Sequence, residues 1–158
     1  MIAFGHTAIG SVIGIIGYDY FGQNSPLVGI TTTTAVSIAS HYLTDFIPHG
    51  HFIRSQEYKK KIWPILIFDL ALGILIFTLF SYYKFGLGLA TLYILFGIGG
   101  SHLPDIIKGL VHIDFFPKKG FFKIESAFHK AIHWHGTLSI SLLDVWQVVV
   151  VLLALLFF

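Results

Sequence analysis

Apolar residues occur in five long runs, separated by polar segments that contain glycine, proline, serine or lysine. A helix that crosses a bilayer needs about 20 mostly apolar residues, and each run has approximately that length. The second run contains a row of threonines, whose hydroxyls can bond back to the backbone of their own helix inside a membrane. We therefore predict five transmembrane helices. They cover approximately residues 2–18, 27–47, 62–83, 85–107 and 138–158.

The segment between the fourth and fifth runs has a different pattern. Pro117 and Gly120 interrupt it, and residues 121–134 then place apolar side chains at helical spacing with lysines and histidines on the other faces. This pattern is typical of a short amphipathic helix that lies in the membrane interface. The predicted fold class is therefore all-α, an integral membrane bundle of about five transmembrane helices plus one short interfacial amphipathic helix, forming a single domain over residues 1–158.

Composition supports a membrane protein and excludes several functional classes. Apolar residues make up 55% of the chain and charged residues only 11%, whereas a soluble domain has about 25% charged residues. Without cysteine, the chain can form neither disulfides nor thiolate metal sites. A net charge of +2 is too small to indicate nucleic-acid binding. The start of the chain lacks the basic segment of a cleaved signal peptide, so Met1 is expected to be the mature start.

The basic residues predict the orientation in the membrane. Nine of the ten lysines and arginines follow the second or the fourth run, and Lys84 alone follows the third. Positive charge is enriched on the cytoplasmic side of membrane proteins. We therefore expect a multi-pass protein of the cell (inner) membrane, with a cytoplasmic N-terminus and an external C-terminus.

Small residues recur at a spacing of four in two of the predicted helices. Gly10 and Gly14 lie in the first, and Gly97 and Ser101 lie in the fourth. Such pairs allow a second helix to approach closely. Glycine is also tolerated in membrane helices without such a contact, so the pattern leaves both interpretations open.

Histidines and aspartates gather at one depth of the predicted bundle. In this orientation all of them lie near the cytoplasmic side, although the lysines alone set the topology. Ionisable groups within membrane helices are costly and usually functional. The residues in this band are His6, His41, Asp45, His49, His51, Asp69, His102, Asp105, His129, His133, His135 and Asp144.

The spacing of these residues predicts a metal site. His41 and Asp45 are four residues apart and therefore share a helix face, and His102 and Asp105 are three apart. Imidazole and carboxylate ligands suit a divalent ion, with zinc or manganese expected. The predicted metal ligands are His6, His41, Asp45, His102, Asp105 and His129. The predicted catalytic residues, acting as general acid or base, are His49, Asp69 and His133.

Each of these assignments has a plainer alternative. His49 could lie in the interface, His129 and His133 could form the polar face of an interfacial helix, and Asp144 could pair with a lysine. Asp69 could be a further ligand or could orient a ligand histidine. Charges elsewhere, Glu125 among them, are expected to face solvent.

The sequence Ser40-His41-Tyr42-Leu43-Thr44-Asp45 after an apolar segment resembles the Ser-His-x-Leu-x-Asp signature of the membrane-bound metal-dependent hydrolases. This group includes the LexA-regulated inner-membrane proteins. Leu103-Pro104-Asp105 resembles the family's Leu-Pro-Asp motif, and Gly5-His6-Thr7 its N-terminal histidine. The family's His-Arg-Gly-x-Thr-His-Ser motif is missing, and its nearest counterpart here is residues 135–139. A weaker similarity links His41, Asp45, Pro48 and His49 to the zinc-binding segment of the zinc phospholipase C and nuclease group.

These observations predict a membrane-embedded metal-dependent hydrolase that acts at the cytoplasmic membrane face on a phosphate-ester or lipid substrate. The expected partners are the lipid bilayer and a lipid or phosphorylated substrate, without nucleic acid. Two alternatives remain open. Intramembrane histidines and aspartates also build relays in proteins that translocate metal ions or protons, and they could bridge helices in a non-catalytic membrane subunit.

Overall fold

The computed structural model describes residues 3–46, 62–112, 114–132 and 140–158. Within these ranges the fold is all-α, with six helices and no strand. The helices follow one another in the predicted order. They are α1 (Ala3–Phe21), α2 (Pro26–Asp45), α3 (Ile62–Phe85), α4 (Leu89–His112), α5 (Gly120–Ile132) and α6 (Ile140–Leu155).

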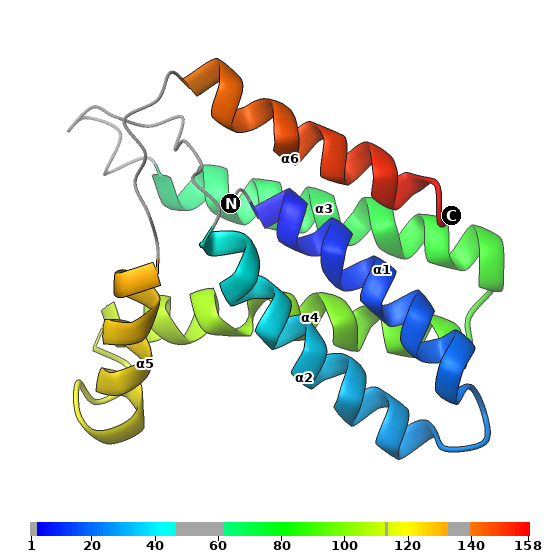
Figure 1. Ribbon diagram of the computed structural model, residues 1–158, viewed down its shortest axis with the longest axis horizontal. Coiled ribbons are helices and arrows are strands. Elements are labelled where there is room, and N and C mark those ends of the chain that lie inside the picture. Colours follow the sequence, from blue (N-terminus) through cyan, green and yellow to red (C-terminus); the bar gives the residue numbers. More distant parts are fainter. Residues whose placement is uncertain (1–2, 47–61, 113, 133–139) are drawn as a thin grey trace.

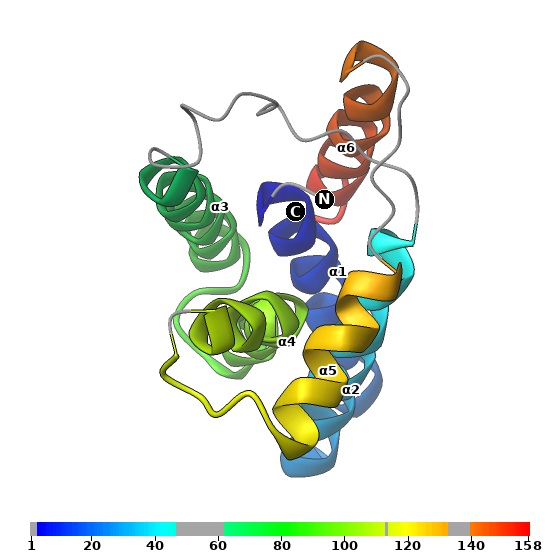
Figure 2. The ribbon, with the colours of Figure 1, turned by 90° about the vertical axis from the view of Figure 1, so that its left-hand side faces the viewer.

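Helix α1 lies at the centre of the bundle (Figures 1 and 2). It packs most extensively against α4 and also contacts α2, α3 and α6. Helix α5 lies across one end of the bundle, where it contacts α4 and α2. The start of α1 and the ends of α2 and α4 reach this same end, so residues far apart in the sequence come together there.

Glycines determine how closely the central helices approach. A Cβ added at Gly10 would lie 2.5 Å from the carbonyl oxygen of Gly97, and one at Gly14 would lie 2.5 Å from Cα of Ile94. A Cβ at Gly100 would lie 2.7 Å from the carbonyl oxygen of Thr34, which belongs to α2. Because these neighbours are backbone atoms, no side chain can move aside to make room. Of the two interpretations that the sequence left open, the structure shows the close approach, and α4 approaches both α1 and α2 in this way.

The interior combines an apolar cluster with buried hydroxyls. Every fourth residue of α2 is buried, and these residues are mostly polar. Thr31 and Thr34 donate to the carbonyl oxygens four residues earlier at 2.8 Å, as predicted for this threonine-rich helix. The buried apolar cluster consists of Ala8, Ile15, Phe77, Ile94, Ile98 and Ala154.

The ends of the helices differ from the sequence prediction in ways that local chemistry explains. Helix α2 begins at Pro26, and proline is favourable in a first turn because its missing N–H has no partner there anyway. Helix α3 continues to Phe85, and α4 starts at Leu89 rather than at residue 85. Gly86 lies between them with φ +69°, a left-handed conformation that glycine adopts without strain.

Among the described residues, Leu89–Val111 is long and apolar enough to cross a membrane, and Leu70–Phe85 is apolar but shorter. This finding does not confirm five spanning helices, and the predicted orientation of the termini stays a prediction. Large apolar side chains are nevertheless exposed along several helices. Examples are Leu43, Phe68, Leu79, Tyr83, Ile124 and Leu152, each more than half exposed.

Candidate metal centre

The end of the bundle that α5 crosses brings together histidines and carboxylates from four helices. His6 comes from the start of α1 and His41 from the last turns of α2. Asp45 is the last residue of α2. The fourth and fifth helices supply the remaining members, which are His102 and Asp105 on α4 and His129 on α5. The structure thus places all six residues predicted as metal ligands at one end of the bundle.

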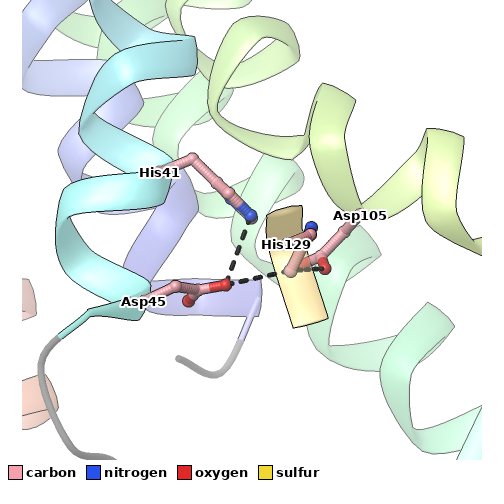
Figure 3. Close-up of side chains that lie close together, drawn as sticks. All are labelled: His41, Asp45, Asp105 and His129. Carbon is pink, nitrogen blue, oxygen red and sulfur yellow. Dashed lines mark ion pairs between the residues drawn. The ribbon is translucent and has the colours of Figure 1, made fainter. Parts of the chain in front are cut away.

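Four of these side chains form a compact set. One ligand atom from each of His41, Asp45, Asp105 and His129 lies within 4.8 Å of the others (Figure 3). Asp45 and the two histidines are buried, whereas the side chain of Asp105 is 45% exposed. The set offers two nitrogen and two oxygen ligands, and it is therefore a His/Asp cluster that could hold a metal ion.

Asp45 is the centre of this arrangement. Its Oδ2 lies 3.4 Å from Nε2 of His41 and 3.2 Å from Nε2 of His129. Its Oδ1 lies 3.2 Å from Nε2 of His6. The Nε2 atom of His129 is also 3.5 Å from Oδ1 of Asp105. The carboxylate of Asp45 therefore faces three imidazoles that come from three different helices.

The hydrogen bond of His41 shows why a cation fits here. Its Nδ1 lies 2.7 Å from the carbonyl oxygen of Ser101, and because a carbonyl only accepts, Nδ1 carries the proton. A neutral imidazole then has a lone pair on Nε2, which faces the Asp45 carboxylate. No hydrogen bond from the described residues satisfies this buried Nε2. Two electron-rich atoms at this distance repel each other unless a proton or a cation lies between them, so the donor set fits a metal ion.

Ser101 is well placed to accept this bond. It lies in α4 three residues before Pro104, and its carbonyl faces His41 of α2. Gly100, beside Ser101, allows α2 to approach α4 closely. The same stretch of α4 therefore provides both the close contact and the acceptor that orients His41.

His6 and His102 lie beside the four-residue cluster. The rings of His6 and His41 stack with centroids 4.2 Å apart. Nε2 of His102 lies 2.8 Å from the hydroxyl oxygen of Thr7, and its ring meets that of His6 edge to face. These contacts direct Nε2 of His102 toward Thr7, so the structure gives His102 a supporting position rather than a place in the compact set.

One sequence prediction is wrong. Glu125 was expected to face solvent, but it is buried at 6% exposure on the inner face of α5. Its Oε1 accepts a hydrogen bond from the hydroxyl of Tyr42 at 3.2 Å and lies 3.5 Å from Nδ1 of His129. The spacing of four between Glu125 and His129 was a signal for a shared helix face, but a lone glutamate in a basic segment looks like a surface charge.

The side chains predicted to be catalytic lie outside the part that the structure describes. His49 and His133 fall outside the described ranges, and so does His135. Asp69 lies in α3, and Asp144 lies in α6, but the side chains of both are outside the described part. The roles predicted for them stay predictions.

An apolar hollow of about 530 Å³ lies away from the cluster, along α2 and Phe96 of α4. Among the described residues that line it, the threonine hydroxyls are the only polar side-chain groups, and none of these residues is suited to acid–base or metal chemistry. The exposed side of Asp105 is instead the point at which the described cluster meets the surroundings.

Comparison with protein-family models, with curated proteins and with solved structures gave no match for this chain. The functional argument therefore depends on the geometry of the cluster and on the motifs in the sequence.

Proposed function

We propose that this chain is a membrane-embedded hydrolase that uses a divalent metal ion held by His41, Asp45, Asp105 and His129. The observation that carries the proposal is the convergence of these four ligand atoms, from three helices, within 4.8 Å of one another. Burial of three of the four side chains supports it, because a buried carboxylate such as that of Asp45 needs a charged partner.

The donor set and the exposure of the site suit a hydrolase. Mixed imidazole and carboxylate sets favour zinc or manganese. When bound, such an ion lowers the pKa of a coordinated water and polarises a phosphoryl or acyl oxygen. The chain itself excludes water from most of the cluster by burying Asp45, His41 and His129. Asp105 leaves one side open, where a substrate can enter.

The surroundings favour a lipid or another phosphate ester at the membrane surface. Helix α5 carries His129 on its buried face and exposes Phe121, Ile124 and Phe128 on another. Exposed lysines, Lys118, Lys119 and Lys123, lie on and just before this helix. An apolar face next to basic side chains is suited to an anionic lipid surface, which supports a lipid or phosphate-ester substrate for this site.

Metal analysis of the detergent-purified protein tests this proposal directly. We expect a bound divalent ion in the wild type, and hydrolysis of phosphodiester or phospholipid substrates that is lost on chelation and restored by zinc or manganese. Absence of binding after addition of either metal would instead support a structural subunit whose histidines and aspartates only bridge helices. Metal binding without any hydrolysis across this substrate panel would refute the catalytic part.

One observation favours translocation as a second candidate. The buried face of α2 continues from Asp45 and His41 through Ser37 and Thr33. The hydroxyl oxygens of Ser37 and Thr33 are buried and make no hydrogen bond with the described residues. A file of polar groups along a helix can carry protons or ions through a bundle.

Flux into proteoliposomes distinguishes the two functions. Translocation predicts uptake of protons or of zinc that falls when Ser37→Ala and Thr33→Val remove the hydroxyls. A hydrolase predicts no uptake and unchanged turnover in these variants, since neither hydroxyl lies in the His/Asp cluster. The exposed Thr32→Val change on the same helix is the matched control.

A further inference from the structure

Glu125 has a position that the proposed hydrolase does not yet use. It is buried on α5, and one of its oxygens, Oε1, lies between Tyr42 of α2 and His129 one helical turn further along. The other oxygen, Oε2, is buried and makes no hydrogen bond with the described residues. A carboxylate is costly to bury without charged or hydrogen-bonding partners, so this position needs an explanation.

The two nitrogens of His129 face different groups. Nε2 lies 3.2 Å from Asp45 and 3.5 Å from Asp105, and it is therefore the ligand atom of the cluster. Nδ1 lies 3.5 Å from Oε1 of Glu125. Metal-binding histidines commonly direct their second nitrogen at a carboxylate or a carbonyl, which fixes the ring and makes the ligand nitrogen more basic.

His41 has a similar arrangement, but a different kind of oxygen faces its Nδ1. Its Nε2 faces Asp45, and its Nδ1 donates to the backbone carbonyl of Ser101. Both histidines of the compact set therefore present Nε2 to the cluster and Nδ1 to an oxygen outside it. That oxygen belongs to a neutral carbonyl at 2.7 Å for His41 and to a carboxylate at 3.5 Å for His129, so only the second oxygen carries negative charge.

We propose that Glu125 is a positioning residue that fixes His129 with Nε2 toward the cluster, and that Tyr42 holds Glu125 in place. The inference rests on the proposed metal site and deepens it. Tyr42 belongs to α2, three residues before Asp45, so its hydroxyl ties the carboxylate of Glu125 to the helix that supplies two other ligands. Glu125 thereby sets the direction of Nε2 of His129. Its negative charge also makes this nitrogen a stronger metal ligand.

The variant Glu125→Gln isolates the charge from the packing. Glutamine has the same shape, and its amide oxygen can still accept from Tyr42, so α5 should stay docked. Cobalt(II) is the probe, titrated into metal-stripped full-length protein in detergent and followed by its visible absorption. We expect the affinity for cobalt(II) to fall about 10–100-fold, the usual effect of removing a group that orients a ligand. Tyr42→Phe should give a smaller loss, and Lys123→Gln on an exposed face of α5 should give none.

Two further measurements separate positioning from a merely structural role. Amide hydrogen exchange of α5 in the metal-free protein should be the same in wild type and Glu125→Gln. With zinc bound, the ring ¹⁵N shifts of His129 should show the metal on Nε2 and the proton on Nδ1 in wild type, and a larger share of rings that bind through Nδ1 in Glu125→Gln. A loss of α5 protection that accounts for the weaker binding, or unchanged ring shifts, would overturn the inference.

The outcomes also separate this inference from the proposed function. If wild type binds no cobalt(II), the proposed metal site is refuted, and the proposed role of Glu125 is refuted with it. If wild type binds cobalt(II) and Glu125→Gln binds it equally well, the metal site stands and only the positioning role is refuted.

Discussion

The two parts of the candidate metal centre are held in place by different kinds of contact. Helix α4 approaches both α1 and α2 through glycines that leave backbone in contact with backbone. Helix α5 packs against α4 and only slightly against α2. It meets the cluster through the polar groups of Glu125 and His129, and its Phe128 ring contacts that of Tyr42. Three ligands, His41, Asp45 and Asp105, therefore come from the frame, meaning α1, α2 and α4, whose relative positions are fixed by packing. The fourth ligand, His129, comes from α5, whose docking depends on its contacts with the site.

Removing Asp45 should have the largest effect, because its carboxylate is the point where the frame and α5 meet. It faces His6 and His41 of the frame and His129 of α5. Asp45→Ala should weaken cobalt(II) binding by more than the about 100-fold upper range for an orienting group, while the helical content by circular dichroism stays unchanged. Asp19→Ala, an exposed position at the far end of α1, is the control. Wild-type affinity in both Asp45→Ala and Asp105→Ala would exclude this site.

A methyl group at the glycine contact between α1 and α4 should lower the stability of the protein. In Gly97→Ala the new Cβ would collide with the backbone of Gly10, and such overpacking costs about 1–3 kcal/mol. Gly99→Ala is the matched control, since nothing lies within 4 Å of that position. It should be neutral or more stable by up to about 1 kcal/mol, because alanine favours helix. Thermal unfolding in detergent measures both, and equal stability of the two variants would count against the close approach of α1 and α4.

Metal should protect α5 more than it protects α4. If the ion completes the docking of α5, adding cobalt(II) at 100 times its dissociation constant should stabilise the docked state by about 2.7 kcal/mol. Hydrogen exchange of α5 amides should then slow by up to about 100-fold, while amides near Gly97 change little. Equal slowing in both helices would show that α5 and the frame form one cooperative unit.

The smallest effect is expected at the surface ion pair that precedes α5. Lys118 lies 2.7 Å from Asp114, and both side chains are more than half exposed. Exposed pairs contribute about 0–1 kcal/mol, so Lys118→Ala should leave cobalt(II) affinity and α5 exchange near wild type. A loss as large as that of Glu125→Gln would mean that surface charge, rather than the buried glutamate, holds this helix.

Much of the fold could be predicted because its signals are local. Apolar runs and turn residues predicted the order of the helices, and the spacing of Gly10 and Gly14 allowed for a close contact, which the structure shows. Helix spacing likewise placed His41 and Asp45 on one face. The exact ends were harder, because Gly86 and Pro26 act over one or two residues.

The parts that could not be predicted depend on contacts between distant segments. Nothing near Glu125 in the sequence shows that Tyr42, 83 residues away, donates to it. His102 has the same chemistry as His41, yet Thr7 of another helix directs its Nε2 elsewhere. A motif cannot identify the carbonyl of Ser101 as the acceptor for His41, because every residue has a backbone carbonyl. Only the three-dimensional packing distinguishes these roles.

Asp45 ends α2, and this position has a consequence for the order of events at the site. The carboxyl end of a helix has a partial charge of about −0.5, which comes from its unpaired carbonyls. The buried carboxylate of Asp45 adds to this charge, and Asp105 lies close by. A phosphate ester that arrived first would meet repulsion, whereas a cation is attracted. Under the proposed function, the fold therefore requires that the metal ion binds before an anionic substrate can enter.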